Sequence, residues 1–369
     1  MQYINVANQG VKSLSPYQAG KPIEELEREL GITNIVKLAS NENPFGFPKS
    51  AKKAIQAQLD HLTRYPDANG FELKAAIAKK FGVQPNQITL GNGSNDLLEL
   101  FAHTFAGEHD EVIYSQYAFI VYPLVTKAIN AVAKEIPAKD WGHDLNGFLT
   151  ALSDKTKLIF IANPNNPTGN FLTEAELDAF LTKVPENVIV VLDEAYTEFT
   201  HPSERVNSFA LLDKYPNLIV SRSLSKAYGL AGLRIGYAVS NPEIADLLNR
   251  VRQPFNCNSL ALTSAIAVMN DDAFVEKVAE NNRQEMKRYE AFCQQYGLDF
   301  IPSKGNFITI DFKQPAAPIY DALLREGVIV RPIAGYGMPN HLRISIGLPQ
   351  ENDKFFTALK KVLNLGNEK

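Results

Sequence analysis

The sequence has few of the residues that mark a secreted or metal-binding protein. Only two cysteines occur, Cys257 and Cys293, without the spacing of metal ligands, and the six histidines do not cluster. So few cysteines fit a reducing compartment better than a disulfide framework. These shortages argue against both a disulfide-stapled scaffold and a metal centre.

Long runs of apolar or like-charged residues are also missing. No apolar run approaches the ~20 residues needed to cross a bilayer, and the first 22 residues have no apolar core. Lys and Arg number 37 against 41 Asp and Glu, a formal net charge of -4 with no long run of either sign. Nothing therefore indicates a nucleic-acid surface or a polybasic membrane patch. We expect a soluble, cytoplasmic protein that acts on small molecules.

The length points to more than one domain. A chain of 369 residues exceeds a typical domain, and its 45% hydrophobic residues can bury a substantial core. We expect a large domain over residues 41–265 and a smaller domain over 266–369, which the N-terminal segment 1–40 joins. A long helical pattern near 271–295 leads into the shorter elements of the second domain.

Between about residues 49 and 240, short apolar runs alternate with helical patterns. The strand candidates are "QITL", "EVIY", "AVAKEI", "KLIFIA", "NVIVVL", "NLIVS" and "LRIGYAV". Continuous apolar strands separated by amphipathic helices predict an α/β fold, with a mostly parallel sheet covered on both faces. Ligands should then gather at the carboxyl ends of the strands.

Lys226 follows one of these strand candidates and has neighbours that are unusual for a surface lysine. In "SRSLSKAYGLAGLRIGY", Lys226 lies three residues after Ser223 and eight before Arg234, across a glycine-rich turn. A hydroxyl, an amine and a guanidinium can thus converge on one ligand, and the arginine's planar fork suits a phosphate. Burial near other cations would lower the lysine pKa and make the amine nucleophilic. The alternative is an ordinary surface loop.

Three more strand candidates end in polar residues. "ITLGNGSND" places Ser94 and Asn95 at a helix start, where free amides favour a phosphate, although such a turn also serves as a simple cap. "NPNNPTG" leaves Asn166 as an amide donor or as part of a structural loop. In "VLDEAY", Asp193 ends an apolar strand with Tyr196 close behind. A carboxylate there needs a cationic or N–H partner, or caps a helix.

One cofactor needs all four features at once. Pyridoxal 5′-phosphate requires a phosphate cradle, a donor to its phenolate oxygen, a carboxylate for its ring nitrogen and a Schiff-base lysine. The order "NPxNPTG", "DEAY" and "SxSKAYGLAGLRIGY" resembles the fold-type I aminotransferases of the histidinol-phosphate aminotransferase family. The resemblance covers nearly the whole chain, from "LSPYQAGKP" through "KLASNENPFG", "RYPD" and "GNGSND" to "LRISIG".

The resemblance implies roles for the residues nearest the chemistry. Lys226 would bind the cofactor covalently and then move a proton between the substrate carbon and the cofactor. Asp193 would pair with the protonated ring nitrogen, so that the ring remains an electron sink. Tyr196 and Asn166 would hydrogen-bond the phenolate oxygen.

The resemblance also implies how the rest of the cofactor is held. Tyr117 would stack on the ring, and Tyr65 in "RYPD" would reach across a homodimer interface to the partner's cofactor phosphate. The chain departs from the family's common patterns at "SQYAFIVYP" and at "GNGSND". The phosphate would be held by Ser94, Asn95, Ser223 and Arg234.

The resemblance also implies which residues bind the substrate, and two of these are arginines in the C-terminal part of the chain. Arg343 in "LRISIG" matches the arginine that most of the superfamily uses for a substrate carboxylate, and Arg331 would add charge for a phosphate dianion, unless it is a surface residue beside a turn. Tyr17 and Asn166 complete the predicted substrate set.

These residues predict transamination between L-histidinol phosphate and 2-oxoglutarate, which gives imidazole-acetol phosphate and glutamate. The same residues also fit three alternatives: an aromatic-amino-acid aminotransferase, a threonine-phosphate decarboxylase, and a cofactor-binding regulator without turnover.

Overall fold

The computed structural model describes residues 2–17 and 19–366. Within them, the largest sheet has seven strands in the order β2-β8-β7-β6-β5-β3-β4, and β8 is the one strand that runs opposite to the other six. The predicted α/β class with a mostly parallel sheet is confirmed. The strands are β2 (Ile88–Gly91), β3 (Glu111–Ser115), β4 (Val132–Ile136), β5 (Thr156–Ala162), β6 (Ile189–Asp193), β7 (Leu218–Ser223) and β8 (Gly236–Ser240).

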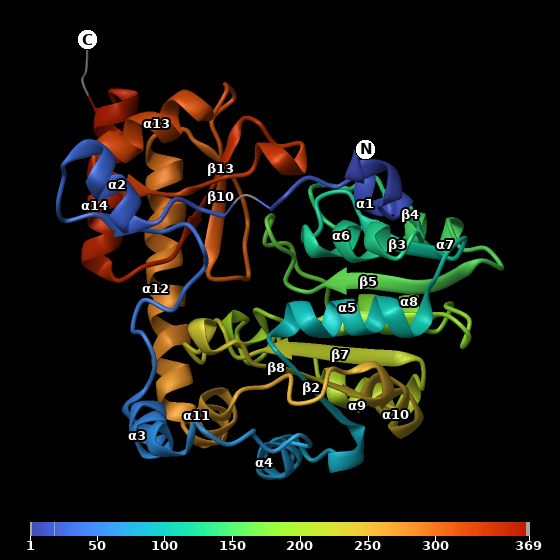
Figure 1. The fold of residues 1–369 in the computed structure, drawn as a ribbon. Helices are drawn as coiled ribbons and strands as arrows, with labels where there is room; N and C mark the ends of the chain where they lie inside the picture. The colour runs from blue at the N-terminus through green and yellow to red at the C-terminus, as the bar shows by residue number, and fades with distance from the viewer. Residues whose placement is uncertain (1, 18, 367–369) are drawn as a thin grey trace.

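Helices cover both faces of this sheet because its central strands are apolar on both sides, whereas the edge strand β4 is largely exposed. In β5, Leu158 and Phe160 pack with α5, α6 and α10, while Ile159 and Ile161 point to the opposite face and its helices. Figure 1 shows α5 lying along the sheet. The first group is α5 (Ser94–Phe105), α6 (Val121–Ala128) and α10 (Pro242–Val251); the second is α4 (Phe71–Phe81), α7 (Leu145–Thr150), α8 (Glu174–Leu181), α9 (Ser208–Lys214) and α11 (Ser259–Met269), with α3 (Lys49–Gln58) packed on α11.

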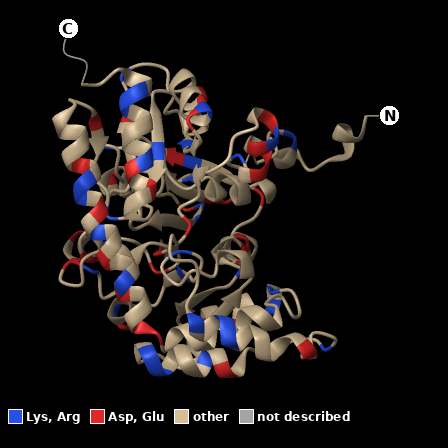
Figure 2. Cartoon of the chain, turned by 90° about the vertical axis from the view of Figure 1, so that its left-hand side faces the viewer, with Lys and Arg blue, Asp and Glu red and all other residues tan. Residues whose placement is uncertain are grey.

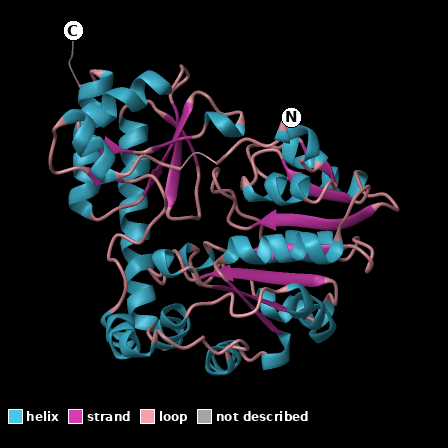
Figure 3. Cartoon of the chain, in the orientation of Figure 1, coloured by secondary structure: helices cyan, strands magenta, loops and turns pink. Residues whose placement is uncertain are grey.

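A second group of elements follows the long helix α12 (Asp272–Gln295) and has its own apolar core. Its antiparallel sheet has the order β12-β13-β10-β9. In Figures 1 and 3, α12 runs from this group down to α3 and α11. The other elements are β9 (Asp299–Ile301), β10 (Phe307–Asp311), β12 (Arg331–Pro332), β13 (His341–Ser345), α13 (Ala317–Arg325) and α14 (Pro349–Leu363).

The later part of the N-terminal segment packs against this second group, whereas its first helix lies on α6 of the large sheet (Figure 1). The segment contains α1 (Gln9–Lys12), α2 (Ile23–Leu30) and β1 (Val36–Lys37). β1 pairs in parallel with β11 (Val328–Ile329), and Leu26 of α2 lies in a small apolar cluster with Leu324 and Ile329. The loop after β1 therefore enters the space between the two sheets.

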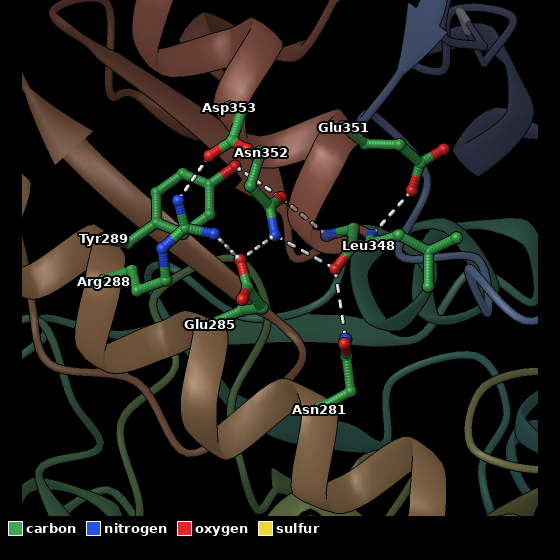
Figure 4. A network of polar contacts seen from close by, with 9 residues as sticks. Asn281, Glu285, Arg288, Tyr289, Leu348, Glu351, Asn352 and Asp353 are labelled. Atoms are coloured by element: carbon green, nitrogen blue, oxygen red, sulfur yellow. Dashed lines mark hydrogen bonds and ion pairs between the residues drawn. The ribbon is translucent and has the colours of Figure 1, made fainter.

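A buried polar network holds α14 on α12 (Figure 4). The Asn352 side chain donates to Glu285 Oε2 at 2.7 Å and accepts from the Tyr289 hydroxyl at 3.0 Å. Its Oδ1 also accepts from the Gly347 amide at 2.9 Å. Because a buried amide without partners is costly, this satisfied network fixes the packing of the two helices.

Charged residues of both signs are mixed on the face shown in Figure 2, and the two cysteines lie in the interior. Figure 2 shows basic and acidic residues interspersed along the helices of the face toward the viewer. Among the described residues, no helix has the length and apolar character needed to cross a membrane. Cys257 and Cys293 are buried as free thiols.

Candidate active site

A cavity of about 290 Å³ lies at the carboxyl ends of β5, β6 and β7, facing β12 and β13 of the second sheet. Its size is near the lower end of ordinary ligand pockets. Every predicted site residue except Tyr117 and Tyr65 lines it. These are Tyr17, Ser94, Asn95, Asn166, Asp193, Tyr196, Ser223, Lys226, Arg234, Arg331 and Arg343.

Lys226 lies in the loop that follows β7, with its side chain at the centre of the site. Its Nζ donates to the Ser40 carbonyl at 3.0 Å and lies 5.9 Å from the centroid of the Tyr196 ring. Burial, assisted by the charge of Arg343, lowers the pKa of Lys226 to about 8, while Glu42 opposes the shift. An appreciable fraction of this amine is therefore neutral and nucleophilic near neutral pH.

Asp193 ends β6 and faces the same space. Its Oδ2 accepts a 2.8 Å hydrogen bond from the Tyr122 hydroxyl, whereas its buried Oδ1 has no hydrogen-bond partner among the described residues. Burial raises the pKa of Asp193 to about 6, while the hydrogen bond from Tyr122 and the nearby Ala195 amide oppose the rise. An unsatisfied buried carboxylate oxygen at a cavity wall is suited to a cationic N–H donor from a ligand.

The N-terminus of α5 and Arg234 form a cradle for an anion. The first amides of a helix have no partner within it, and no side chain caps this one at Gly93. Arg234 lies beside it, held by a 3.2 Å hydrogen bond from Nη1 to the Ser225 hydroxyl. Gly93 has a φ of +83°, which favours glycine, and a Cβ there would lie 2.3 Å from Arg234 Nη2 and displace that guanidinium.

Arg331 and Arg343 face each other across the antiparallel pair β12–β13. Arg343 is buried and donates to Asn166 Oδ1 at 2.6 Å and to the Ala39 carbonyl at 2.8 Å. Arg331 donates to the Tyr17 hydroxyl at 3.2 Å. Like charges directly opposite each other destabilise a strand pair, so this arrangement indicates an anionic ligand.

Two polar side chains between these groups are oriented by their neighbours. Because Asn166 Oδ1 accepts from Arg343, its amide nitrogen is the donor that remains for a ligand. The Tyr196 hydroxyl accepts from Asn41 Nδ2 at 3.0 Å, and burial raises the pKa of Tyr196 to about 12. Tyr196 is therefore a neutral hydrogen-bond donor near neutral pH.

Sequence reasoning assigned no role to several residues of the wall. Ser40, Asn41 and Glu42 come from the loop after β1, and Phe119 and Tyr336 close other sides. The stretch "LASNENP" could have indicated Ser40, Asn41 and Glu42 as site residues, since polar residues and a proline follow an apolar run there. No pattern in the sequence pointed to Phe119 or Tyr336 as residues of the cavity wall.

Two predicted residues lie elsewhere in this chain. Tyr117 packs on Trp141 with ring centroids 5.1 Å apart, while Phe119 from the same loop lines the cavity. Tyr65 is 82% exposed and stacks on Phe255 at 4.6 Å. Ring stacking by Tyr117 and a cross-subunit role for Tyr65 stay predictions.

Comparison with known proteins gives matches over almost the whole chain. Residues 33–359 match the model of the family described as aminotransferase class I and II. Histidinol-phosphate aminotransferase 2 of Haemophilus influenzae (strain 86-028NP) is 88% identical over 363 residues, which cover 98% of this chain and 99% of the relative. Histidinol-phosphate aminotransferase 1 of Mannheimia succiniciproducens is 80% identical, covering 99% of this chain and all of the relative.

A solved structure has the same fold. The histidinol-phosphate aminotransferase of Sinorhizobium meliloti, in complex with pyridoxal-5′-phosphate, superposes with a TM-score of 0.89. It is 29% identical in sequence, and the superposition covers 97% of each chain.

Proposed function

The chain belongs to the histidinol-phosphate aminotransferases within the class I and II aminotransferase family, and we infer that it is a pyridoxal-phosphate-dependent transaminase. It transfers an amino group between L-histidinol phosphate and 2-oxoglutarate, giving imidazole-acetol phosphate and glutamate, a step of histidine biosynthesis. The relative at 88% identity over 98% of the chain supports this assignment.

The residues present fit the cofactor. Asp193 Oδ1, which has no hydrogen-bond partner in the described part of the chain, suits a protonated ring nitrogen, and the start of α5 with Arg234 suits a phosphate. Lys226, on the same cavity, has the lowered pKa that a Schiff-base amine requires. We propose that Ser94, Asn95, Ser223 and Arg234 hold the phosphate and that Tyr196 and Asn166 donate to the ring hydroxyl.

When bound, the cofactor supplies an aldehyde that captures the substrate amine and a pyridinium ring that withdraws electrons from the reacting carbon. The negative charge of Asp193 would keep the ring nitrogen protonated. Lys226 Nζ would take the proton from the amine-bearing carbon of the substrate and pass it to the cofactor carbon that carried the aldehyde. The buried wall around Lys226 limits the access of water to this proton transfer.

The facing pair Arg331 and Arg343 is the structural observation that favours the phosphorylated substrate. A phosphate dianion has more charge and more acceptor oxygens than a carboxylate, so a second guanidinium satisfies oxygens that a single one would leave unpaired. The same pair can receive the carboxylates of glutamate in the other half-reaction.

A half-reaction screen tests the function. Each amino donor is added to the holoenzyme, and the cofactor absorbance is followed as the amine is transferred. We expect histidinol phosphate and glutamate to convert the cofactor fastest. Faster conversion by phenylalanine would favour the aromatic aminotransferase, release of carbon dioxide from threonine phosphate would favour the decarboxylase, and no conversion by any donor would favour a regulator.

The lowered pKa of Lys226 predicts the pH dependence of cofactor capture. Only the neutral amine attacks an aldehyde, and a lysine with a pKa of about 8 is increasingly neutral as the pH rises through that value. The rate at which apoenzyme forms the covalent link, followed by absorbance, should therefore rise with a midpoint near pH 8. Nα-acetyl-lysine is the control, with a midpoint near its ordinary pKa of about 10.4. An enzyme midpoint as high as the control's would contradict a desolvated Lys226.

We propose a homodimer with shared sites, in which Tyr65 reaches the partner's cofactor phosphate. Its exposed ring, outside this chain's cavity, supports the proposal. Mixing Tyr65→Phe chains with Lys226→Ala chains tests it. In a shared arrangement, the heterodimer pairs the intact Lys226 of one chain with the intact Tyr65 of the other, so activity should exceed that of both variant homodimers. Activity no higher than that of the Tyr65→Phe chains alone would exclude the donation.

We further propose two domains, 41–265 and 266–369, with the segment 1–40 joined to the smaller, and a cytoplasmic location. The separate apolar cores around the two sheets support the division. Because α11 crosses residue 265 and buries Val268 and Met269 in the first core, a boundary just after α11 fits the packing better.

A further inference from the structure

We propose that Tyr122 is a positioning residue for the reaction: its hydroxyl fixes one oxygen of Asp193 and thereby presents the other oxygen, still charged, to the ring nitrogen of the cofactor. The inference rests on the cofactor that the proposed function requires. Tyr122 does not line the cavity and sequence reasoning gave it no role. Its action is exerted through Asp193.

The Tyr122 ring is held in place from two sides. It is fully buried near the start of α6 and stacks on Phe160 of β5, with ring centroids 4.7 Å apart and planes inclined by 2°. Phe119 packs edge-on at 5.9 Å and 87°. The Tyr122 amide also donates to the Phe119 carbonyl at 3.0 Å. The hydroxyl is thus placed by packing that does not depend on Asp193.

The hydrogen bond from Tyr122 makes the two carboxylate oxygens of Asp193 inequivalent. Oδ2 accepts from Tyr122 at 2.8 Å, and the other oxygen is buried without a hydrogen-bond partner among the described residues. A carboxylate that could rotate freely would offer either oxygen at varying angles. With Oδ2 occupied, Oδ1 is the atom that remains for a ligand cation.

The same bond opposes the protonation of Asp193. Burial and the charge of Glu194 raise the pKa of Asp193, while the Tyr122 hydroxyl and the Ala195 amide lower it. Burial also raises the pKa of Tyr122 well above its ordinary value, so the phenol stays a donor. Glu194 is itself paired with Arg222 at 2.9 Å, away from this bond. Loss of the Tyr122 hydroxyl should therefore make Asp193 easier to protonate and a weaker partner for a cation.

Tyr122→Phe removes the hydroxyl and keeps the stacked ring. In cofactor-free enzyme labelled with 13C at the Asp carboxyls, infrared difference spectra assigned with Asp193→Asn should show a roughly tenfold or larger rise in the proton affinity of Asp193. The dissociation constant of pyridoxal phosphate should rise by about the same factor. In an Asp193→Asn background, Tyr122→Phe should change this constant less than about twofold, because its effect acts through the carboxylate.

Tyr289→Phe is the matched control, since it removes another buried tyrosine hydroxyl, whose bond to Asn352 lies in the second core (Figure 4). It should leave the Asp193 titration and cofactor affinity unchanged. 3-Fluorotyrosine at position 122 keeps the shape but is a stronger donor, and it should lower the proton affinity of Asp193, which provides a test even if the Phe variant folds poorly.

The proposal is overturned if Tyr122→Phe leaves both quantities within twofold of wild type, if Tyr289→Phe changes them equally, if the effect persists without Asp193, or if fluorotyrosine has no effect. Failure of the wild-type chain to bind the cofactor would instead refute the proposed function, while the Asp193 titration in cofactor-free enzyme still tests the positioning role.

Discussion

Replacing Lys226 with alanine should leave a folded protein that binds pyridoxal phosphate without a covalent link and transaminates at least about 10³-fold more slowly. The effect is large because one amine has two tasks, forming the link and moving the proton, and general acid–base catalysis alone contributes about 10²–10⁴-fold. No other amine lines the cavity formed by the described residues. Measuring kcat/KM for histidinol phosphate, together with far-UV circular dichroism, separates lost chemistry from lost folding.

Lys214→Ala is the matched control for this variant. Lys214 is an exposed lysine that pairs with Asp178 at 2.6 Å, and its loss should leave kcat/KM unchanged. Borohydride reduction of the wild-type holoenzyme, followed by peptide mapping, should place the cofactor on the peptide that contains Lys226. A label on a different lysine, or near-normal turnover by Lys226→Ala, would refute the assignment.

Replacing the two facing arginines should have different consequences. Arg343 is buried, and it orients Asn166 as well as offering charge to a ligand. Truncating a buried partner of a charged group typically costs 2–5 kcal/mol, so Arg343→Ala should lower kcat/KM for every amino donor by about two orders of magnitude or more. Arg331 is the second cation, and its loss should cost roughly 1.5–3 kcal/mol for histidinol phosphate, about one to two orders of magnitude. Phenylalanine should suffer far less, since its ring offers Arg331 no acceptor.

The measurement is kcat/KM for histidinol phosphate, glutamate and phenylalanine in both variants. Arg250→Ala removes an exposed arginine paired with Asp246 and should leave all three values unchanged. Equal losses on all three donors in Arg331→Ala would mean that Arg331 is structural and that the phosphorylated substrate is the wrong choice.

The sequence alone predicted the sheet and the centre of the site, because both depend on local pattern. Seven short apolar runs between helical patterns became the seven strands β2 to β8. Polar residues directly after parallel strands must meet at one edge of the sheet, which brings Asp193 and Lys226 to one cavity whatever path the loops take. Glycine before α5 likewise predicts a close approach of backbone to ligand.

Tertiary structure alone decided the partners of these residues, because contacts between segments far apart in sequence depend on loop paths and strand register. Which aromatic side chain of "SQYAFIVYP" reaches the cavity follows from the course of that loop, and it is Phe119 that lines the wall while Tyr117 packs on Trp141. Tyr122 meets Asp193 across 71 residues. No periodicity encodes which oxygen of a carboxylate a distant hydroxyl will bond. The sequence thus determined which chemical groups gather at the strand ends, and the packing of loops and of the second sheet determined how each group is aimed.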